Sequence, residues 1–417
     1  MLLIRPLKGL RPTEGRAIDV AAPPYDVLNS AEAREMAKGK PWSFLHISKP
    51  EIDLPEGTNP YDDSVYAKGL ENLRSMMEQG ILQQDTAPCY YLYRLKMGEH
   101  TQTGLVGAAS VEAYDANTIK KHEFTRPDKE NDRIRQIDTL NAQTGPVLLS
   151  CPPSSDLEKI MATITKQSPA VDITTEDGIQ HILWVVDDAE DIRSIAQIFT
   201  PESNGLDRLY IADGHHRSAS ASKVAALRIK SNQRHQGGEN YNYFLSVIFP
   251  ANQMQILAYN RVIKDLNGLT NDELLEKVKQ NFDLELSAVA VDPESPKVFG
   301  MYLSGQWYKL KIKEERIPKN NPLAELDVSI LANYLIEPVL GVNDPRRDPR
   351  IDFVGGIRGL SELEKRVDNK EMALAFSLYP TRMEDVMAVA DINEVMPPKS
   401  TWFEPKLADG LVSHMLD

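Results

Sequence analysis

The residues with the greatest capacity for chemistry form one run, Asp213-Gly214-His215-His216-Arg217. This run follows a strand-like stretch at 209–212 and opens an amphipathic helix that continues to about Leu227. A strand that enters a helix through a glycine brings uncapped backbone N–H groups and the positive end of a helix dipole to one point. Arg217 adds a guanidinium that can bind two phosphate oxygens, and the histidines can donate hydrogen bonds. The run therefore predicts a phosphate-binding helix start.

Asp213 has two further predicted roles, because an aspartate at this place can cap the helix or hold Mg²⁺ directly or through water. The bland alternative is a capping aspartate with two surface histidines and an arginine paired to an acid. Adjacent histidines point in different directions on a helix and share no packing face, which favours a functional role. Zinc needs three or four ligands, and His215-His216 has no second ligand cluster at a suitable spacing.

A second group of charged residues lies at 119–126, where Glu123 stands among lysines, a histidine and an arginine. A carboxylate surrounded by cations stays ionised and can act as a general base towards a substrate hydroxyl. The cations can hold anionic groups of a substrate. The alternative is a solvated loop and helix start. The residues of this group with a predicted substrate contact are Lys121, His122, Thr125, Arg126 and Arg133.

A third group, Lys399-Ser400-Thr401, is similar to the end of a P-loop but lacks the preceding glycine-rich turn. The prolines and aromatics of 396–403 favour a rigid loop that could close over a ligand, against a plain structural loop. The glycines of 355–359 are a weaker candidate for a close backbone approach to an anion.

The helices and strands that must position these groups are predicted from the spacing of apolar residues and from prolines and glycines that end regular structure. Prolines make 21–26 a fixed extended loop, 42–47 reads as a strand, and 89–111 reads as a hairpin around 98–100. Helical patterns cover 31–38 and 62–79, and a helix opened by Pro127 runs through Leu140 before a strand at 147–151. After 255, strands at 256–263, 297–303 and 307–312 surround a helix at 271–282. The pattern predicts an α+β (mixed α/β) protein with three regions, 1–100, 101–255 and 256–417.

Composition excludes several classes of protein. The net charge of −14 repels nucleic acid, so no nucleic-acid partner is expected. No apolar run approaches the ~18 residues that span a bilayer, and the N-terminus has no secretory pattern, so we expect a cytoplasmic protein without a membrane partner. Cys89 and Cys151 have no CxxC partner and are expected to be reduced structural residues.

Five segments of the sequence resemble, in the same order, one bacterial ParB-like family of unknown function in the ParB/sulfiredoxin superfamily. These segments are 23–26, 120–123, 141–146, 212–217 and 396–403. Asp213 to Arg217 is also similar to the motif of the free serine kinases of that superfamily. The resemblance implies a ParB/sulfiredoxin-like phosphate-binding core at 101–255 with α+β regions on either side. It also implies nucleotide phosphates bound by 213–217 and a catalytic base at Glu123.

Two other functions of that superfamily do not fit these residues. Sulfiredoxins carry a cysteine where this chain has His215, so the thiol needed for sulfinic-acid reduction is missing. ParB partition proteins bind DNA through a helix-turn-helix domain, and this acidic chain shows no basic recognition helix.

The expected activity is a phosphotransferase, with free L-serine as the leading acceptor and O-phosphoserine as the product. The expected catalytic residues are Glu123, His216 and Arg217. The expected phosphoryl donor is ATP, ADP or pyrophosphate, with Mg²⁺ held by Asp213. The residues expected to bind this donor are Asp213, Gly214, His215, His216, Arg217, Lys399, Ser400 and Thr401. A nucleotide-sensing regulatory protein and, last, a metal-dependent hydrolase remain as alternatives. The sequence leaves the oligomeric state open.

Overall fold

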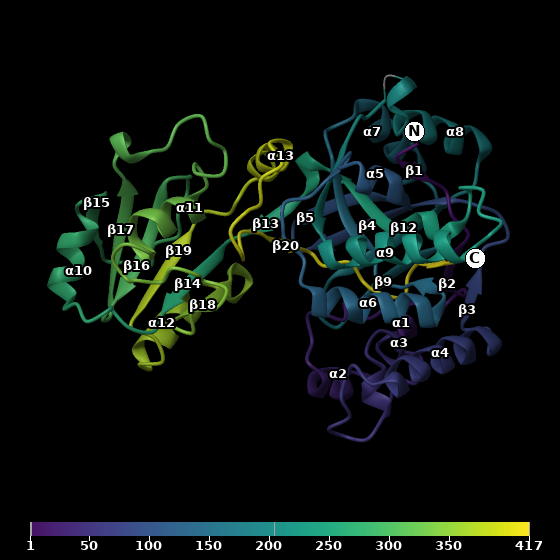
Figure 1. Cartoon of the computed structure of the whole chain (residues 1–417), viewed down its shortest axis with the longest axis horizontal. Coiled ribbons are helices and arrows are strands. Elements are labelled where there is room, and N and C mark those ends of the chain that lie inside the picture. Colours follow the sequence, from purple (N-terminus) through teal and green to yellow (C-terminus); the bar gives the residue numbers. More distant parts are fainter. Residues whose placement is uncertain (1, 204, 417) are drawn as a thin grey trace. The chain divides into compact units, whose positions relative to one another are not determined.

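The computed structural model describes residues 2–203 and 205–416, which form two compact units. Unit 1 comprises Met1–Met254 with Pro405–Asp417, and unit 2 comprises Gln255–Glu404 (Figure 1). Both units combine helices with sheets of mostly antiparallel strands, so the predicted α+β class is confirmed. The chain therefore leaves unit 1 once, forms unit 2, and returns to unit 1 for its last segment.

The main sheet of unit 1 has nine strands among the described residues. Its order is β6 (Ile119–Lys120), β11 (Leu209–Asp213), β8 (Val147–Cys151), β12 (Tyr243–Pro250), β5 (His100–Ser110), β4 (Tyr90–Met97), β10 (Gln180–Val186) and β9 (Val171–Thr174), with β1 (Ile4–Arg5) paired to β5. The pairs β11–β6 and β12–β8 are parallel, and the other pairs are antiparallel. This order sets the end of β11 next to β8.

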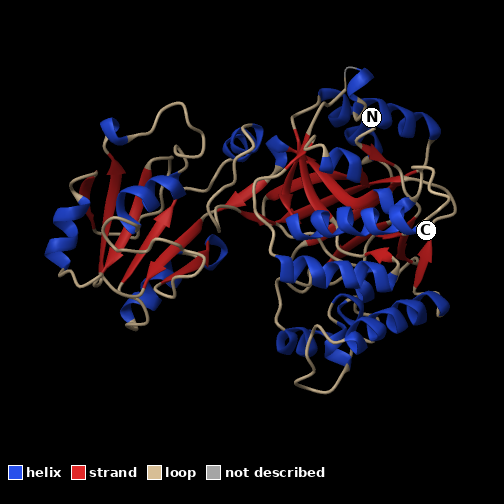
Figure 2. Cartoon of the chain, viewed as in Figure 1, coloured by secondary structure: helices blue, strands red, loops and turns tan. Residues whose placement is uncertain are grey.

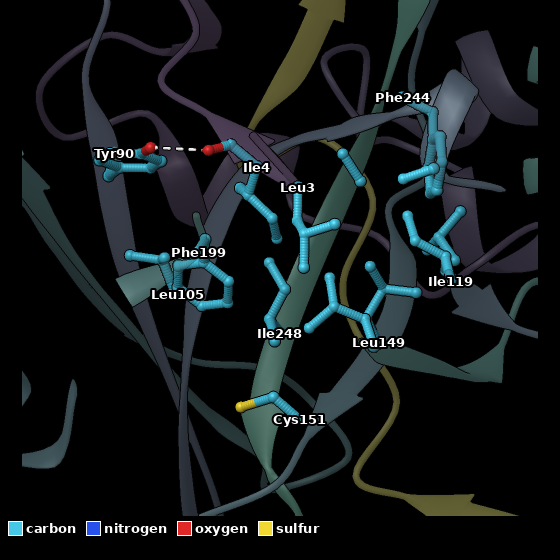
Figure 3. Close-up of a cluster of buried hydrophobic side chains, with 14 of the residues drawn as sticks. Leu3, Ile4, Tyr90, Leu105, Ile119, Leu149, Cys151, Phe199, Phe244 and Ile248 are labelled. Atoms are coloured by element: carbon cyan, nitrogen blue, oxygen red, sulfur yellow. Dashed lines mark hydrogen bonds between the residues drawn. The ribbon is translucent and has the colours of Figure 1, made fainter. Parts of the chain in front are cut away.

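Apolar side chains from the centre of this sheet form the core of unit 1. Leu149 of β8, Ile248 of β12 and Leu105 of β5 are fully buried and gather with Leu3 and Phe199 (Figure 3). The hydroxyl of Tyr90 in this core donates to the carbonyl of Ile4 at 2.9 Å. A buried sheet of this kind is a rigid support for the loops at its strand ends.

Several helices of unit 1 begin at capping residues that the sequence supplies. Asn29 and Glu32 form a capping box at α2, and Ser154 and Asp188 cap α7 and α8. The helices are α1 (Ala17–Val20), α2 (Ser30–Ala37), α3 (Leu45–Ser48), α4 (Asp63–Glu78), α5 (Val111–Asp115), α6 (Pro127–Leu140), α7 (Ser155–Ile164), α8 (Ala189–Ile198) and α9 (His215–Ser231). Helices α6 and α9 lie side by side (Figure 2) and are joined by the ion pair of Arg228 and Asp138 at 3.0 Å.

A small second sheet brings the C-terminal segment back into unit 1. Its order is β3 (Leu82–Gln84), β2 (Gly9–Pro12), β21 (Ser413–Met415) and β7 (Ala142–Gln143). His414 pairs with both Gly9 and Gln143, and the backbones of Ala22 and Asp409 form an antiparallel bridge. These pairings fix residues 405–416 between the N-terminal region and the strand that follows α6.

Unit 2 is built on a six-stranded antiparallel sheet. Its order is β15 (Phe282–Ser287), β17 (Gln306–Ile312), β16 (Val298–Leu303), β19 (Leu374–Leu378), β14 (Tyr259–Ile263) and β18 (Ile351–Gly355). A separate pair is formed by β13 (Gln255–Leu257) and β20 (Trp402–Glu404). The helices of this unit are α10 (Asn271–Val278), α11 (Asp327–Leu331), α12 (Leu360–Asp368) and α13 (Met383–Asp391).

Most predicted elements are present, with small differences at their ends. The predicted hairpin is confirmed as β4 and β5, and the helix from Pro127 to Leu140 is confirmed as α6. The strand predicted at 42–47 is wrong, because Leu45–Ser48 is a helical turn. The regions 1–100 and 101–255 fall in one compact unit, and residues 405–417 join it; the three-region division stays a prediction. None of the described helices has the length and apolar character to cross a membrane.

Candidate active site

The junction of β11 and α9 has the geometry of an anion-binding helix start. Gly214 is the N-cap residue, with φ 98° and ψ 29°, so the prediction that Asp213 caps the helix is wrong. No described side chain caps α9, which leaves its first-turn N–H groups without an intrahelical partner. A Cβ at Gly214 would stand 3.0 Å from Arg217 Nε. Glycine is therefore required by both the backbone angle and the space.

Asp213, the last residue of β11, faces two cations. Its Oδ2 lies 3.0 Å from Lys406 Nζ, and its Oδ1 lies 3.6 Å from Arg217 Nη2. Burial acts to raise the pKa of Asp213, but Lys406 and Arg217 outweigh burial and hold that pKa well below its ordinary value. The predicted role of Asp213 in holding Mg²⁺ stays a prediction.

Arg217, in the first turn of α9, has one guanidinium nitrogen bonded within the protein and keeps further N–H donors for a ligand. Its Nη1 donates to the carbonyl of Pro146, and its Cδ would be 3.3 Å from a Cβ at Gly145. The 3.6 Å separation between Nη2 and Asp213 is longer than a hydrogen bond. The guanidinium can therefore still donate to an anionic ligand.

His215 links the helix start to the predicted base, Glu123. His215 Nε2 accepts from the backbone N–H of His122 at 3.4 Å, which assigns the proton of the neutral ring to Nδ1. Nδ1 lies 3.6 Å from Glu123 Oε2. Burial, and then the neighbouring His122, lower the pKa of His215 well below its ordinary value, so the ring is neutral. The Glu123 side chain is 56% exposed and open to a substrate.

The loop that carries Glu123 is attached to α9 at two points. The rings of His122 and His215 meet edge to face with centroids 4.5 Å apart. Burial lowers the pKa of His122 to about 4, and its Nδ1 has no partner among the described residues. His216 Nε2 accepts from the backbone N–H of Arg126 at 3.0 Å. The two histidines thus position the loop against the helix start.

The other predicted substrate residues make contacts within the protein. Lys121 Nζ donates to the carbonyl of Tyr114 at 2.7 Å and lies over its ring. The hydroxyl of Thr125 donates to Glu130, and exposed Arg126 pairs with Asp128 at 2.9 Å. Arg133, another predicted substrate residue, lines a pocket of unit 1. The substrate contacts of the others stay predictions.

That pocket lies in unit 1 and contains about 450 Å³ of space, part of it open to solvent. It is bounded by α6, the segment 143–147, the start of β12, α9 and the C-terminal segment. Its polar lining residues include Tyr25, Ser48, Gln143, Arg133, Arg217 and Asp409. Arg217 thus belongs to both the helix start and the pocket.

Asp409 is a site residue that sequence analysis did not identify. It is 1% exposed, and its Oδ1 has no hydrogen-bond partner among the described residues. Burial raises its pKa to about 7, against the opposing effect of Arg217. The sequence carried a sign of this: Asp409 interrupts the apolar run 407–412, where a buried acid needs a partner.

Arg133 is positioned by a chain of contacts between helices. Its guanidinium lies 3.9 Å from the ring centroid of Tyr25 and donates to Asp132 at 2.7 Å. The other oxygen of Asp132 accepts from Tyr66 of α4 at 2.8 Å. Burial raises the pKa of Tyr25 to about 12, so its hydroxyl is protonated. Tyr25 belongs to the extended loop at 21–26 that was predicted from its prolines, and this loop therefore forms part of the pocket wall.

The third predicted group lies in unit 2. Ser400 Oγ donates to the carbonyl of Pro397 at 2.6 Å, and the carbonyl of Lys399 accepts from Arg261 at 3.0 Å. The role of Lys399, Ser400 and Thr401 in donor binding stays a prediction. Within residues 2–203 and 205–416, no group of three or more histidine, cysteine or acidic side chains is arranged to hold a metal ion.

The fold and site define an α+β protein with a polar pocket at a strand-to-helix junction. Its sequence matches the family described as "Protein of unknown function (DUF1015)" over residues 4–329. The chain belongs to that family. No curated protein matches it. Its place in the ParB/sulfiredoxin superfamily stays a prediction.

Several solved structures are similar to the chain at low identity. A conserved hypothetical protein from Pyrococcus furiosus is 15% identical, with 73% of this chain and 93% of that chain covered and a TM-score of 0.35. A free serine kinase in complex with AMP is 16% identical, with 73% and 91% covered and a TM-score of 0.35. SbnI from Staphylococcus aureus, with a C-terminal truncation, is 13% identical, with 74% and 86% covered and a TM-score of 0.37. These values are too low to support an assignment of function.

Proposed function

We propose that the protein is a phosphotransferase that moves a phosphoryl group from a nucleotide or pyrophosphate donor to the hydroxyl of a small metabolite. One observation carries the proposal: the exposed carboxylate of Glu123 lies 3.6 Å from Nδ1 of His215, in the first turn of the uncapped helix α9 that also carries Arg217. Phosphoryl transfer asks the protein mainly for positioning and for charges that stabilise the phosphates. This junction supplies both.

The donor phosphates would lie at the start of α9. The first-turn N–H groups and the positive end of the helix dipole favour anions, and Arg217 can donate to two phosphate oxygens. Lys406 adds a second cation through its contact with Asp213. Mg²⁺ would come with the donor phosphates, and no step needs it on Asp213.

Glu123 would act as the base. Its carboxylate lies 3.6 Å from Nδ1 of His215, the nitrogen that carries the proton of the neutral ring. As the acceptor oxygen forms its bond to phosphorus, Glu123 takes the hydroxyl proton, and the bond from phosphorus to the donor's leaving oxygen breaks. His216, expected to be catalytic, accepts from the loop backbone, so we propose that it positions the loop.

Free L-serine is the proposed acceptor, as the resemblance of the Asp213–Arg217 motif implies, with O-phosphoserine as the product. Arg133 supports a small acidic acceptor, because its guanidinium lines a pocket that also contains Arg217.

The test is ³¹P NMR on the purified protein with Mg²⁺, L-serine and, in separate tubes, ATP, ADP and pyrophosphate. We expect a serine-dependent phosphomonoester signal with one donor. Glu123→Gln should reduce the rate by roughly 10²–10⁴-fold with little change in donor binding. Glu99→Gln, at an exposed position in the β4–β5 turn, is the matched control.

Two results would contradict the proposal. If Glu123→Gln kept the wild-type rate, the base would be another residue. If the donor stayed intact in every tube while nucleotide bound tightly, the protein would be a nucleotide-binding regulatory protein.

A further inference from the structure

We propose that the pocket of unit 1 binds a small molecule with an ammonium group and an acidic group on neighbouring atoms, and that Asp409 binds the ammonium. The proposal rests on the proposed function in one respect, since the bound molecule would be the phosphoryl acceptor. The binding itself is independent of catalysis. It assigns a role to a residue that no sequence motif singled out.

Two unpartnered acceptor atoms point to a missing ligand group. Asp409 Oδ1 and Ser48 Oγ are both buried and have no hydrogen-bond partner among the described residues, and both residues line the same pocket. Buried polar atoms in proteins are nearly always bonded, so two such atoms in one pocket indicate an absent partner. A group with several N–H donors would satisfy them.

Two arginines of the pocket require a ligand group with a negative charge. Arg217 donates to Pro146 through Nη1, and its Nη2 lies 3.6 Å from Asp213, beyond hydrogen-bond distance. Arg133 uses Nε and Nη2 on Asp132 and has Nη1 left. Both guanidiniums are largely buried, with side chains 10% and 12% exposed. An acidic group on the ligand would accept hydrogen bonds from them.

The combination of charges selects between ligands. A simple amine would meet the two arginines, and a simple carboxylate would meet Asp409, so each would carry one unfavourable contact. A molecule with both groups satisfies both walls. The remaining wall is apolar, with Ile137, Val147 and Phe244, and suits a short carbon chain.

The charge state of Asp409 provides a second, independent signature. The groups that affect it are Arg217 of α9, Arg133 of α6, and Tyr25 and Asp26 of the N-terminal loop. Burial raises the pKa of Asp409 to about 7, so near neutral pH part of the population is protonated. An ammonium beside the carboxyl favours the ionised form, and binding therefore releases protons.

The experiment is isothermal titration calorimetry on the full chain without nucleotide. The probes are L-serine, L-alanine, 3-hydroxypropionate, which lacks the ammonium, and ethanolamine, which lacks the acid. We expect L-serine and L-alanine to bind at least about tenfold more tightly than the other two, since each of those leaves one charged wall unpaired. Repeating the L-serine titration in buffers of different ionisation enthalpy should show proton release.

Asp409→Asn should weaken L-serine binding at least about tenfold, tighten binding of 3-hydroxypropionate by removing its unfavourable contact, and remove the proton release. Asp283→Asn, at an exposed position in unit 2, is the control. If Asp409→Asn does not fold, the ranking of the four probe affinities on the wild-type protein still tests whether the pocket selects a ligand with both charged groups. Equal binding of 3-hydroxypropionate and L-serine, or no binding of either amino acid, would overturn the assignment.

The two proposals fail separately. Phosphoryl transfer to 3-hydroxypropionate as fast as to L-serine would leave the phosphotransferase and remove the ammonium site. Amino-acid binding that depends on Asp409, without any transfer, would leave the ammonium site and remove the phosphotransferase.

Discussion

Gly214 shows how one backbone angle sets the properties of the site. Its φ of 98° lets the chain turn from β11 into α9, and a Cβ there would stand 3.0 Å from Arg217 Nε. We expect Gly214→Ala to destabilise the protein by about 1–2 kcal/mol and to weaken binding of ADP, measured by urea unfolding and calorimetry. Gly98→Ala, at φ 57° with nothing within 4 Å, should destabilise without changing ADP binding. Unchanged ADP affinity in Gly214→Ala would place the phosphates elsewhere.

A second prediction at the residue scale concerns pH. The folded state raises the pKa of Asp409 from 3.8 to about 7, so it binds this proton more tightly than the unfolded state does. The resulting stabilisation is complete below about pH 4 and is lost as pH rises to about 7. Relative to wild type, Asp409→Asn should therefore gain in free energy of unfolding between about pH 4 and about pH 7.

Asp213→Asn is the matched control for that measurement. The pKa of Asp213 is lowered in the folded state, so its stabilisation is present above the unfolded pKa of 3.8 and is lost only as pH falls below it. The variant should be less stable than wild type by the same amount throughout that pH range. If Asp409→Asn followed this flat pattern, Asp409 would be ionised throughout the range.

Among the site residues, the sequence predicted those that are neighbours along the chain. Asp213 to Arg217 stand on one strand-to-helix turn, and their types and order alone indicate an anion site. Asp409 comes close to Arg217 through the pairing of β21 with β2 and β7 and through its backbone bridge to Ala22. No local pattern encodes that long-range pairing, so the predicted site lacked one wall.

At the scale of elements, α4 and α6 hold Arg133 in the pocket through Tyr66 and Asp132. Tyr66→Phe removes the 2.8 Å hydrogen bond to Asp132 and leaves a buried carboxylate oxygen without that donor. We expect a loss of about 1–3 kcal/mol in the free energy of unfolding, with weaker L-serine binding. Tyr61→Phe removes an exposed hydroxyl that accepts from Lys129 and should change neither quantity. Wild-type stability in Tyr66→Phe would mean that Arg133 is positioned by Tyr25.

The helices and strands that sequence analysis placed correctly begin or end at residues that cap or interrupt regular structure. Pro127 opens α6, and Asn141, at φ 51°, ends it. The error at 42–47 has a physical reason: an apolar run of this length fits a strand and a buried helical turn equally well. Phe44, Leu45 and Ile47 are all buried in the packing of the N-terminal region, and that tertiary environment selects the helix.

At the scale of the whole molecule, each unit has its own sheet and its own hydrophobic cluster. We therefore expect two steps in urea unfolding, with ADP or L-serine raising the midpoint of unit 1 alone. The four tryptophans allow each step to be followed, since Trp42 and Trp184 lie in unit 1 and Trp307 and Trp402 in unit 2. Replacing one pair by phenylalanine leaves fluorescence from the other unit. A single transition shifted equally in both variants would show one cooperative unit.

The return of the chain to unit 1 at Pro405 has a consequence for biosynthesis. Translation proceeds from the N-terminus, so all of unit 2 must be made before the segment with Lys406 and Asp409. Until then a nascent chain can contain the helix start and Glu123 but not the acidic wall of the pocket. A ribosome-bound intermediate would thus lack a complete binding site, and the order of synthesis delays ligand capture until unit 2 has been made.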